Sequence, residues 1–360
     1  MRISLLTLSI IAVMNAEIQD RMHLQRRTQM IKGDDFLKIL VIFTGGTIGS
    51  TVSDGIISSD KTKKYKLIDM YRKSSSDDIE FTYDEPCTLL SEDLTGEYMN
   101  KLGRCIESHL SDEIGGMIVT HGTDTVQYHA AAIDLAFPKL NMPVLFVSGN
   151  YVLDDPASNG LANFTAAADF IKNKIDTGVF VPYRNSDNII YIHRAVNLLP
   201  HLPYCDDMTS IASKYAGIMS TDGTFEPNEN YSVCCSFPEG LLLPSSWNSG
   251  ILRITPYPGM SYPKLAEDTC RAVLLDTYHS GTLCSINPDM KDFCESAYKL
   301  GIPVYLTGAG EGLQYESVKA WKEMHINTLK TGSPITAYMK LWMAMEGGAG
   351  GAALDRIMMS

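Results

Sequence analysis

Two short loops rich in threonine and glycine carry the residues best suited to catalysis. Residues 44–50 read TGGTIGS, and residues 120–125 read THGTDT. A threonine hydroxyl is a weak nucleophile until a neighbouring base takes its proton. Thr47 in the first loop, and Thr123 beside Asp124 in the second, therefore suggest nucleophilic catalysis whose participants come from two separate loops.

Glycines in these loops would let the backbone approach a ligand closely. Gly45 and Gly46 allow a sharp turn off the preceding strand, and Gly122 does the same in the second loop. The helix expected after the second loop offers free amides to a carboxylate or an oxyanion. Taken singly, each loop is also consistent with an ordinary turn, in which Asp124 or Thr125 caps the helix. Neither loop matches Gly-x-Gly-x-x-Gly or Gly-Lys-Ser/Thr, so a nucleotide site is disfavoured.

Alternating strand and helix patterns must position these loops. Nearly continuous apolar runs closed by glycine are typical of buried parallel strands. Such runs span residues 37–46, 115–122, 142–149, 270–281 and 302–310, and helical patterns span 94–110, 125–137, 162–175 and 288–301. The alternation predicts right-handed βαβ units and an α/β fold. Ligands of such sheets bind outside the carboxyl ends of the strands, where both loops are expected.

Composition narrows the class of protein. The 360 residues allow about two domains, and 45% hydrophobic with 20% charged residues indicates an ordinary folded chain that is not a polytopic membrane protein. A net charge of -12 without a basic block disfavours nucleic-acid binding. The eight cysteines contain no Cys-x-x-Cys pair and are interpreted as mostly buried free thiols. His121 and His193 belong to no metal-ligand spacing, so no metal is assigned.

Residues 1–16 have the pattern of a signal peptide. Arg2 precedes an apolar run that ends near Ala16, and this run is too short to span a bilayer. The alternative is an upstream extension, because Met22 and Met30 could each start a shorter chain. The protein is expected to be exported if the segment is a signal peptide and cytoplasmic otherwise.

Together, the two loops resemble the paired signature motifs of the bacterial-type L-asparaginase family. That family includes the glutaminase-asparaginases and a transfer-RNA amidotransferase subunit. LLSEDLT at residues 89–95 resembles the family's substrate-binding serine loop, and PYPGM, AVLLDTYHSGT and IPVYLTGAG follow in the second half. The resemblance covers roughly residues 38–345.

The resemblance implies a two-domain asparaginase-like α/β fold, with a larger N-terminal domain built on a mostly parallel sheet and a smaller C-terminal α/β domain. We expect the N-terminal domain over residues 38–220, a linker over 221–250 and the C-terminal domain over 251–345. Residues 1–37 would be an extension or signal peptide, and residues 346–360, which include a glycine-rich run, a tail. Relatives usually form dimers or tetramers, so a homodimer or homotetramer without nucleic-acid or membrane partners is expected.

The resemblance also implies an activity: hydrolysis of the small-molecule substrate L-asparagine to L-aspartate and ammonia, without a metal or cofactor. Thr47 matches the family's primary nucleophile, which forms an acyl-enzyme that water hydrolyses. Thr123 matches the second threonine, and Asp124 the residue that binds the substrate's α-amino group.

Further positions match the family's substrate-binding residues. Ser91 matches the residue that holds the α-carboxylate, and Glu92 stands where relatives have a glutamine or an acid. The backbone amides around Gly46 and Gly122 are natural oxyanion donors, each contributing on the order of 3 kcal/mol if preorganised.

Two departures from the family pattern concern proton transfer. Ile56 stands where the family places a tyrosine that assists the first threonine, and Tyr65 lies further along as a conceivable replacement. The family also has a lysine that deprotonates the second threonine, whereas residues 191–203 offer only Arg194, which stays protonated. His193 is either a strand histidine or a replacement base, and His121 is expected to orient its loop.

These departures leave three functions open. The first is an L-asparaginase-like amidohydrolase. The second is a catalytically impaired member that binds an amino acid without turnover. The third is a transfer-RNA amidotransferase-like subunit, against which the acidic balance of the chain argues. The preference for asparagine over glutamine depends on a difference of about 1 to 3 kcal/mol, which the sequence leaves open.

Overall fold

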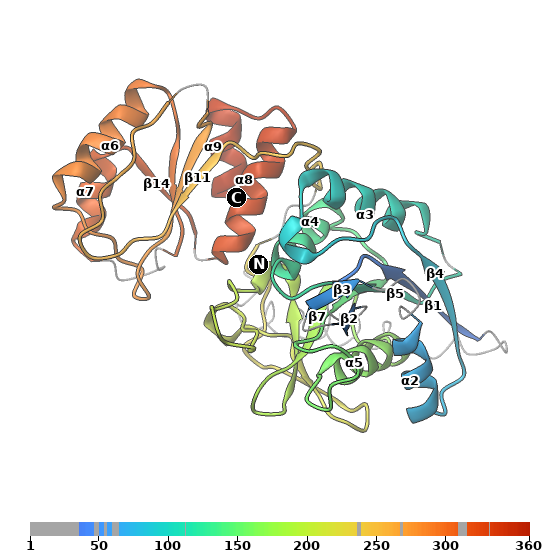
Figure 1. The fold of residues 1–360 in the computed structure, drawn as a ribbon. Coiled ribbons are helices and arrows are strands. Elements are labelled where there is room, and N and C mark those ends of the chain that lie inside the picture. The colour runs from blue at the N-terminus through green and yellow to red at the C-terminus, as the bar shows by residue number, and fades with distance from the viewer. Residues whose placement is uncertain are drawn as a thin grey trace, which may run out of the picture. The chain divides into compact units, whose positions relative to one another are not determined.

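The computed structural model describes residues 36–360, apart from 47–49, 54–55, 60–64, 112, 236–238, 267–268, 309–314 and 331. The expected nucleophile Thr47 and the expected signal peptide at residues 1–16 lie outside the described residues. Residues 37–360 form one compact unit, in which strands and helices alternate as the sequence predicts (Figure 1).

Fourteen strands and eight α-helices are described, and their bounds follow. The strands are β1 (Leu37–Phe43), β2 (Ser50–Ser53), β3 (Ile56–Ser59), β4 (Ile79–Asp84), β5 (Gly116–Thr120), β6 (Pro143–Val147), β7 (Gly178–Arg184), β8 (Ile190–Arg194), β9 (Gly217–Met219), β10 (Phe225–Pro227), β11 (Ile251–Ile254), β12 (Ala272–Leu275), β13 (Val304–Leu306) and β14 (Ile326–Thr328). The helices are α2 (Lys66–Ser74), α3 (Gly96–Ser108), α4 (Val126–Ala136), α5 (Gly160–Lys172), α6 (Pro288–Lys299), α7 (Ser317–Glu323), α8 (Pro334–Glu346) and α9 (Gly351–Met359). Short 3-10 turns cover η2 (Ser91–Asp93), η3 (Ala195–Asn197) and η4 (Ile211–Ser213).

The larger sheet has eight strands in the order β10-β9-β8-β7-β6-β5-β1-β4. The strands from β7 to β4 in this order run parallel to one another, and β8, β9 and β10 add an antiparallel extension. This mostly parallel α/β architecture confirms the predicted fold class. Because β1 and β5 are adjacent, the loops that follow them emerge side by side at the carboxyl edge of the sheet.

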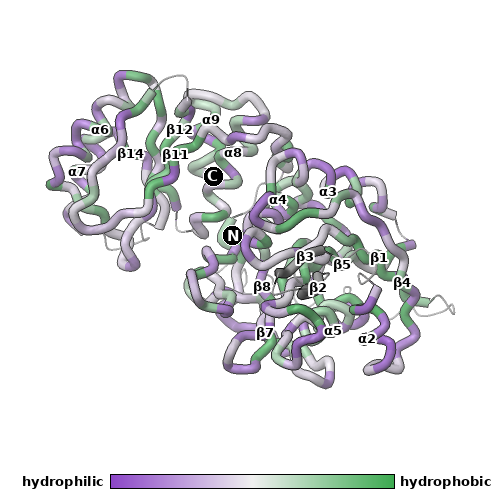
Figure 2. The backbone as a smooth tube through the Cα atoms, viewed as in Figure 1, coloured by the Kyte–Doolittle hydropathy of each residue, from purple (hydrophilic) through white to green (hydrophobic). Residues whose placement is uncertain are grey.

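Alternating residues of β1 face two different cores. Ile39 and Val41 pack on the side of α2 and α5, whereas Leu40 and Ile42 pack on the side of α3 and α4. Figure 1 shows the two helix pairs on opposite faces of the sheet, and Figure 2 shows hydrophobic residues along its central strands. Burial on both faces explains why the strand reads as a continuous apolar run.

The second sheet is entirely parallel, in the order β11-β12-β13-β14. One face packs against α6 and α7, and the other packs against α8 and α9. The expected tail therefore ends in a helix, because Leu354 and Met358 recur four residues apart and bury their side chains against this sheet. The glycine-rich run at residues 347–351 leads to the prediction of a tail, so the helix is not predicted from the sequence.

The expected linker also begins differently. Residues 225–227 form β10, which extends the larger sheet through a hairpin with β9. Gly223 takes a φ of +82° in the turn, and the backbone amide of Ser220 donates to the carbonyl of Thr224. The larger sheet thus continues into the predicted linker, while the other predicted domain limits stay predictions.

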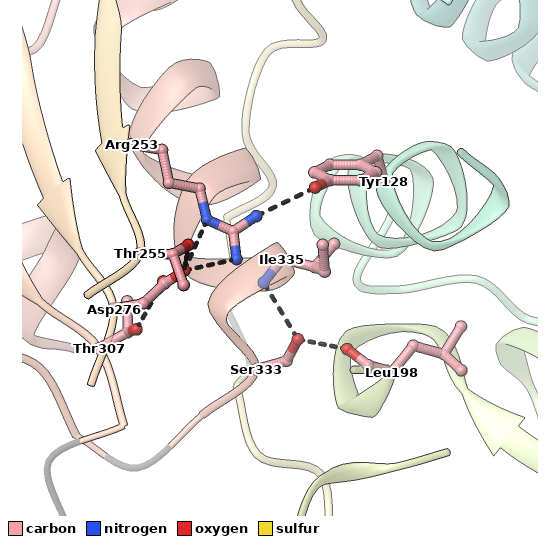
Figure 3. A network of polar contacts seen from close by, with 8 residues as sticks. All are labelled: Tyr128, Leu198, Arg253, Thr255, Asp276, Thr307, Ser333 and Ile335. Atoms are coloured by element: carbon pink, nitrogen blue, oxygen red, sulfur yellow. Dashed lines mark hydrogen bonds and ion pairs between the residues drawn. The ribbon is translucent and has the colours of Figure 1, made fainter. Parts of the chain in front are cut away.

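Polar contacts connect α4 and η3 to elements of the second half (Figure 3). The Arg253 guanidinium bonds the carboxylate of Asp276 and donates to the hydroxyl of Tyr128 on α4 at 3.0 Å. The hydroxyl of Ser333, which caps α8, donates to the carbonyl of Leu198 after η3. Helix α8 also packs on α4 through Met339 and other apolar residues.

Two further expectations concern cysteines and membranes. All eight cysteines are free, and three of them are buried, four are half-buried and Cys284 is exposed. Burial is therefore less extensive than predicted. Within the described part of the chain, every helix is too short or too polar to cross a bilayer.

Candidate functional site

The two loops that carry the predicted site residues are tied together where their strands end. The Thr44 hydroxyl donates to the carbonyl of Thr120 at 2.6 Å, and the Thr44 amide donates to the Thr120 hydroxyl at 3.4 Å. Both threonines are buried. The first residue of each loop is therefore held by the other loop rather than by water.

Gly46 touches the backbone of the second loop. Its φ is +85°, which favours glycine. A Cβ atom at this position would lie 2.4 Å from the amide nitrogen of Gly122 and 2.5 Å from the carbonyl carbon of His121. Only a residue without a side chain fits here, so Gly46 and Gly122 bring two backbone segments into direct contact one residue before Thr47.

A third segment joins them through Gly45. Its φ is +103°, and it forms a parallel bridge with Leu89, whose amide donates to the carbonyl of Thr44 at 3.1 Å. A Cβ atom at Gly45 would lie 2.3 Å from the carbonyl oxygen of Leu89. This bridge positions Ser91, two residues further along, at the mouth of the strands.

Ser91 links the third segment to the second loop by two hydrogen bonds. Its hydroxyl donates to Oδ2 of Asp124 at 3.1 Å, and its carbonyl accepts from the hydroxyl of Thr125 at 2.7 Å. Ser91 is buried, whereas Asp124 is exposed. Thr125 occupies the N-cap position of α4, but neither it nor Asp124 caps the helix, because their side chains face Ser91.

The predicted site residues thus converge in large part. The structure brings together Gly46, Gly122, Ser91 and Asp124, and Thr123 lies half-buried between Gly122 and Asp124. Glu92 follows Ser91 in η2 and is exposed. Thr47, one residue beyond Gly46, belongs to the undescribed segment 47–49.

The arrangement suits a ligand with both charges of an amino acid. An exposed carboxylate at Asp124 attracts an ammonium group, and the Ser91 hydroxyl beside it can donate to a carboxylate. The backbones of Gly46 and Gly122 meet close to Ser91, and Gly122 lies four residues before α4 begins at Val126. A cavity of about 360 Å³ lies next to it, lined by Thr125, Tyr128, Arg253 and six mainly apolar residues.

His121 is committed to its own loop, as the sequence predicts. Its Nδ1 lies 2.9 Å from the carbonyl of Gly122, and its Nε2 lies 3.0 Å from Nδ1 of His129. Because a carbonyl only accepts, Nδ1 of His121 carries the proton and its Nε2 accepts from His129. Burial lowers the pKa of His121 to about 4 and that of His129 well below its usual value. Both rings are neutral supports. Sequence reasoning missed His129, which belongs to no recognised motif.

His193 and Arg194 are structural as well. His193 is buried in β8 with Nδ1 2.8 Å from the hydroxyl of Ser210, and burial lowers its pKa to about 3. Arg194 makes two hydrogen bonds with Asp134 in the last turn of α4, and its guanidinium lies over the ring of Phe180. Asp134 is at the opposite end of α4 from Asp124. His193, the one replacement base considered near the missing lysine, therefore bonds Ser210, and Arg194 bonds Asp134 and Thr177, away from the two loops.

Tyr65 lies at the base of the first loop. Its ring centroid is 5.7 Å from that of Phe43, the last residue of β1, and 5.1 Å from that of Tyr83. The residue is exposed. Ile56, the residue at the family's tyrosine position, belongs to β3, which pairs with β2. Tyr65 therefore has a phenol close to where the first loop leaves the sheet.

Parts of the chain are similar to known proteins. Residues 38–199 match the family described as asparaginase, N-terminal. The chain is 29% identical over 191 residues to a glutamyl-tRNA(Gln) amidotransferase subunit of Methanosarcina barkeri, covering 52% of this chain and 44% of the relative. It is 24% identical over 319 residues to the corresponding protein of Sulfolobus acidocaldarius, covering 84% and 70%. The chain thus spans less than half the length of the first of these relatives.

A solved structure extends the likeness to the whole fold. L-asparaginase I from Vibrio cholerae superimposes with a TM-score of 0.69 at 20% sequence identity, covering 89% of this chain and 95% of that one. Residues 38–199 therefore belong to the asparaginase N-terminal family, and the chain as a whole shares the fold of L-asparaginase structures.

Proposed function

We propose that the protein hydrolyses the side-chain amide of L-asparagine, with Thr47 as nucleophile. The observation that carries the proposal is the hydrogen bond of 3.1 Å between Ser91 and Asp124, next to the contact of Gly46 with Gly122. It supports a site in which donors, an acceptor and an exposed carboxylate converge beside the nucleophile's loop.

Asp124 and Ser91 would hold the amino-acid end of the substrate. The carboxylate of Asp124 pairs with the α-ammonium group, and the Ser91 hydroxyl, once released from Asp124, donates to the α-carboxylate. The exposure of Asp124 leaves it open to an arriving ligand. Glu92, exposed beside Ser91, would define the rim of the site.

Catalysis would proceed in two steps. In the first, Oγ of Thr47 bonds to the amide carbon, the carbon–nitrogen bond breaks, and the hydroxyl proton leaves with ammonia. In the second, water cleaves the aspartyl ester and a proton returns to Thr47. Backbone amides near Gly46 and Gly122 would stabilise the oxyanion in both steps. Thr123 and Asp124 would form a second polar pair in the site.

Proton transfer from Thr47 requires a group other than the structural His121, His193 and Arg194. The phenol of Tyr65 is the candidate that we favour, because its ring packs on Phe43 directly before the first loop. A replacement base in a non-family position is expected to give slower turnover than a preorganised one.

A second candidate function is supply of ammonia within a transfer-RNA amidotransferase. The relatives named as glutamyl-tRNA(Gln) amidotransferase subunits favour it. The net charge of -12 opposes direct contact of this chain with an anionic transfer RNA, so a partner subunit would have to provide that contact.

Ammonia release by the purified full chain tests both. Release from L-asparagine by the chain alone supports the first function. Release from L-glutamine that requires a partner subunit and transfer RNA supports the second. A folded protein that binds L-aspartate without releasing ammonia under either condition would overturn both and identify a binding relative. Size-exclusion chromatography with light scattering tests the expected homodimer or homotetramer.

A further inference from the structure

A cluster of three different metal-ligating side chains lies outside the loops described above. Asp84 ends β4, Cys105 lies in α3, and His109 caps the end of α3. Oδ2 of Asp84 lies 2.9 Å from Nε2 of His109 and 3.4 Å from Sγ of Cys105. The three ligand atoms all lie within 4.8 Å of one another.

We propose that Asp84, Cys105 and His109 form a zinc site. Carboxylate oxygen, thiolate sulfur and imidazole nitrogen are the three ligand types that zinc takes in proteins. Tetrahedral zinc at bond lengths of roughly 2.0 to 2.3 Å holds its ligand atoms about 3.3 to 3.7 Å apart. The Asp84–Cys105 separation of 3.4 Å lies in this range, the Asp84–His109 separation of 2.9 Å is slightly shorter, and all three ligand atoms lie within 4.8 Å of one another, so small side-chain movements would complete the coordination.

The backbone already directs these side chains to one place. Cys105 and His109 are four residues apart and lie on one face of the helix. The other carboxylate oxygen of Asp84 accepts the amide of Glu85 at 2.6 Å, which leaves Oδ2 directed at the helix. Helix α3, which carries Cys105, and strand β4, which ends at Asp84, lie next to each other (Figure 1).

Burial and charge fit a bound cation that exchanges with solvent. Cys105 is buried, while the side chains of His109 and Asp84 keep 34% and 39% of their exposure, so an ion can enter and keep a water ligand. One carboxylate and one thiolate neutralise a divalent cation. The half-buried thiol of Cys87 lies three residues after Asp84 in the sequence and is a candidate for a fourth ligand.

The consequence of metal binding would be structural. Asp84 begins the segment that leads to Ser91, and Cys105 and His109 belong to the helix that follows it. A metal joining these residues would tether the start of the Ser91 segment to the last turn of the helix that follows it. This inference does not depend on the proposed hydrolysis, because no reacting atom is assigned to the metal.

The test uses the full chain after treatment with a chelator. Calorimetry with Zn²⁺ is expected to show one equivalent bound, and Co²⁺ is expected to give the near-ultraviolet charge-transfer absorption of a cobalt thiolate. Cys105→Ser and His109→Gln should each weaken binding at least tenfold, and Cys105→Ser should remove the thiolate absorption. Cys284→Ser and His325→Gln, both at exposed positions in the second half, are matched controls that should leave binding unchanged.

Circular dichroism establishes that each variant is folded, and His109→Gln is the safer of the two because the side chain is part exposed. Failure of the full chain to bind Zn²⁺ saturably would overturn the proposal and leave a hydrogen-bonded triad. Equal binding by the full chain and by a folded His109→Gln variant would also overturn it, because the metal would then bind elsewhere.

Discussion

The guanidinium of Arg194 makes two hydrogen bonds with the carboxylate of Asp134, at 2.7 and 2.6 Å. Only 14% of the Arg194 side chain and 3% of the Asp134 side chain are exposed. The pair joins the end of β8 to the last turn of α4, at the opposite end of this helix from the proposed site. Arg194, which lies in the segment where the family's lysine is expected, therefore has a structural role: it holds β8 against α4.

Breaking this pair should destabilise the protein strongly. We expect Asp134→Ala to lower the free energy of unfolding by about 3 to 5 kcal/mol, because it leaves a buried cation without a partner. Urea unfolding followed by circular dichroism measures the change. Adding Arg194→Met to that variant should recover part of the loss, and a cost below about 1 kcal/mol for Asp134→Ala would contradict the structural role.

Gly46→Ala should cost far more than the same change at another glycine with positive φ. At Gly46 the new Cβ would meet the backbone of Gly122 and His121, whereas at Gly301, with a φ of +68°, nothing lies within 4 Å. Conformational strain is common to both, at about 1 to 2 kcal/mol. We expect Gly46→Ala to exceed Gly301→Ala by at least about 2 kcal/mol in urea unfolding. Equal costs would argue against the close contact of the two loops.

Stability should fall as the pH drops from about 6.5 towards 4. Burial lowers the pKa of His121 to about 4 and that of His193 to about 3, so the unfolded chain binds more protons than the folded chain in this window. Above pH 6.5 both the folded and the unfolded chain keep these rings neutral, so the free energy of unfolding is at its full value. Below pH 6.5 the rings of the unfolded chain take up protons, and the free energy of unfolding falls by on the order of 3 kcal/mol per residue at most. Unfolding curves at several pH values measure the slope.

His193→Gln should flatten that slope, and His325→Gln, at an exposed position stacked on Tyr298, should leave it unchanged. A slope that is the same in all three proteins would show that His193 does not contribute to the pH dependence.

Tyr65→Phe should lower kcat at least tenfold without affecting stability. The substitution keeps the ring that packs on Phe43 and Tyr83 and removes only the hydroxyl proposed to assist Thr47. Steady-state ammonia release at saturating asparagine measures kcat. Tyr298→Phe, at an exposed position in the second half, is the control. An unchanged kcat would exclude Tyr65 as the proton-transfer group.

Ser91→Ala should mainly raise KM. The hydroxyl is proposed to bind the α-carboxylate, which does not change charge during the reaction, so ground state and transition state lose similar binding energy. We expect a rise in KM of about tenfold, corresponding to roughly 1.4 kcal/mol. A large fall in kcat with an unchanged KM would assign Ser91 to the chemical step instead.

The sequence predicts the parallel sheet and the converging loops because their signals are local. Apolar runs closed by Gly45 or preceding His121 indicate strands that end at one edge, and that edge brings Gly46 to Gly122. Contacts made at long separation leave no such signal. The His121–His129 pair and the Arg194–Asp134 pair depend on how helix α4 packs.

The same reason explains the other differences. Leu354 and Met358 are the only two residues of α9 that are buried, and they follow a glycine-rich run. This pattern is too weak to predict α9 from the sequence, because the helix depends on packing against the second sheet. Asp84 lies 21 and 25 residues from Cys105 and His109, so no ligand-spacing rule detects their convergence.

The proposed hydrolysis requires Oγ of Thr47 to attack the amide carbon. The direct measurement is ammonia release from L-asparagine by the full chain and by Thr47→Ala, with Thr269→Ala, an exposed position in the second half, as the control. We predict that Thr47→Ala loses at least a thousandfold of the activity while still binding L-aspartate, and that the control retains it. Ammonia release by folded Thr47→Ala at the rate of the unmodified chain would show that Thr47 is not the nucleophile.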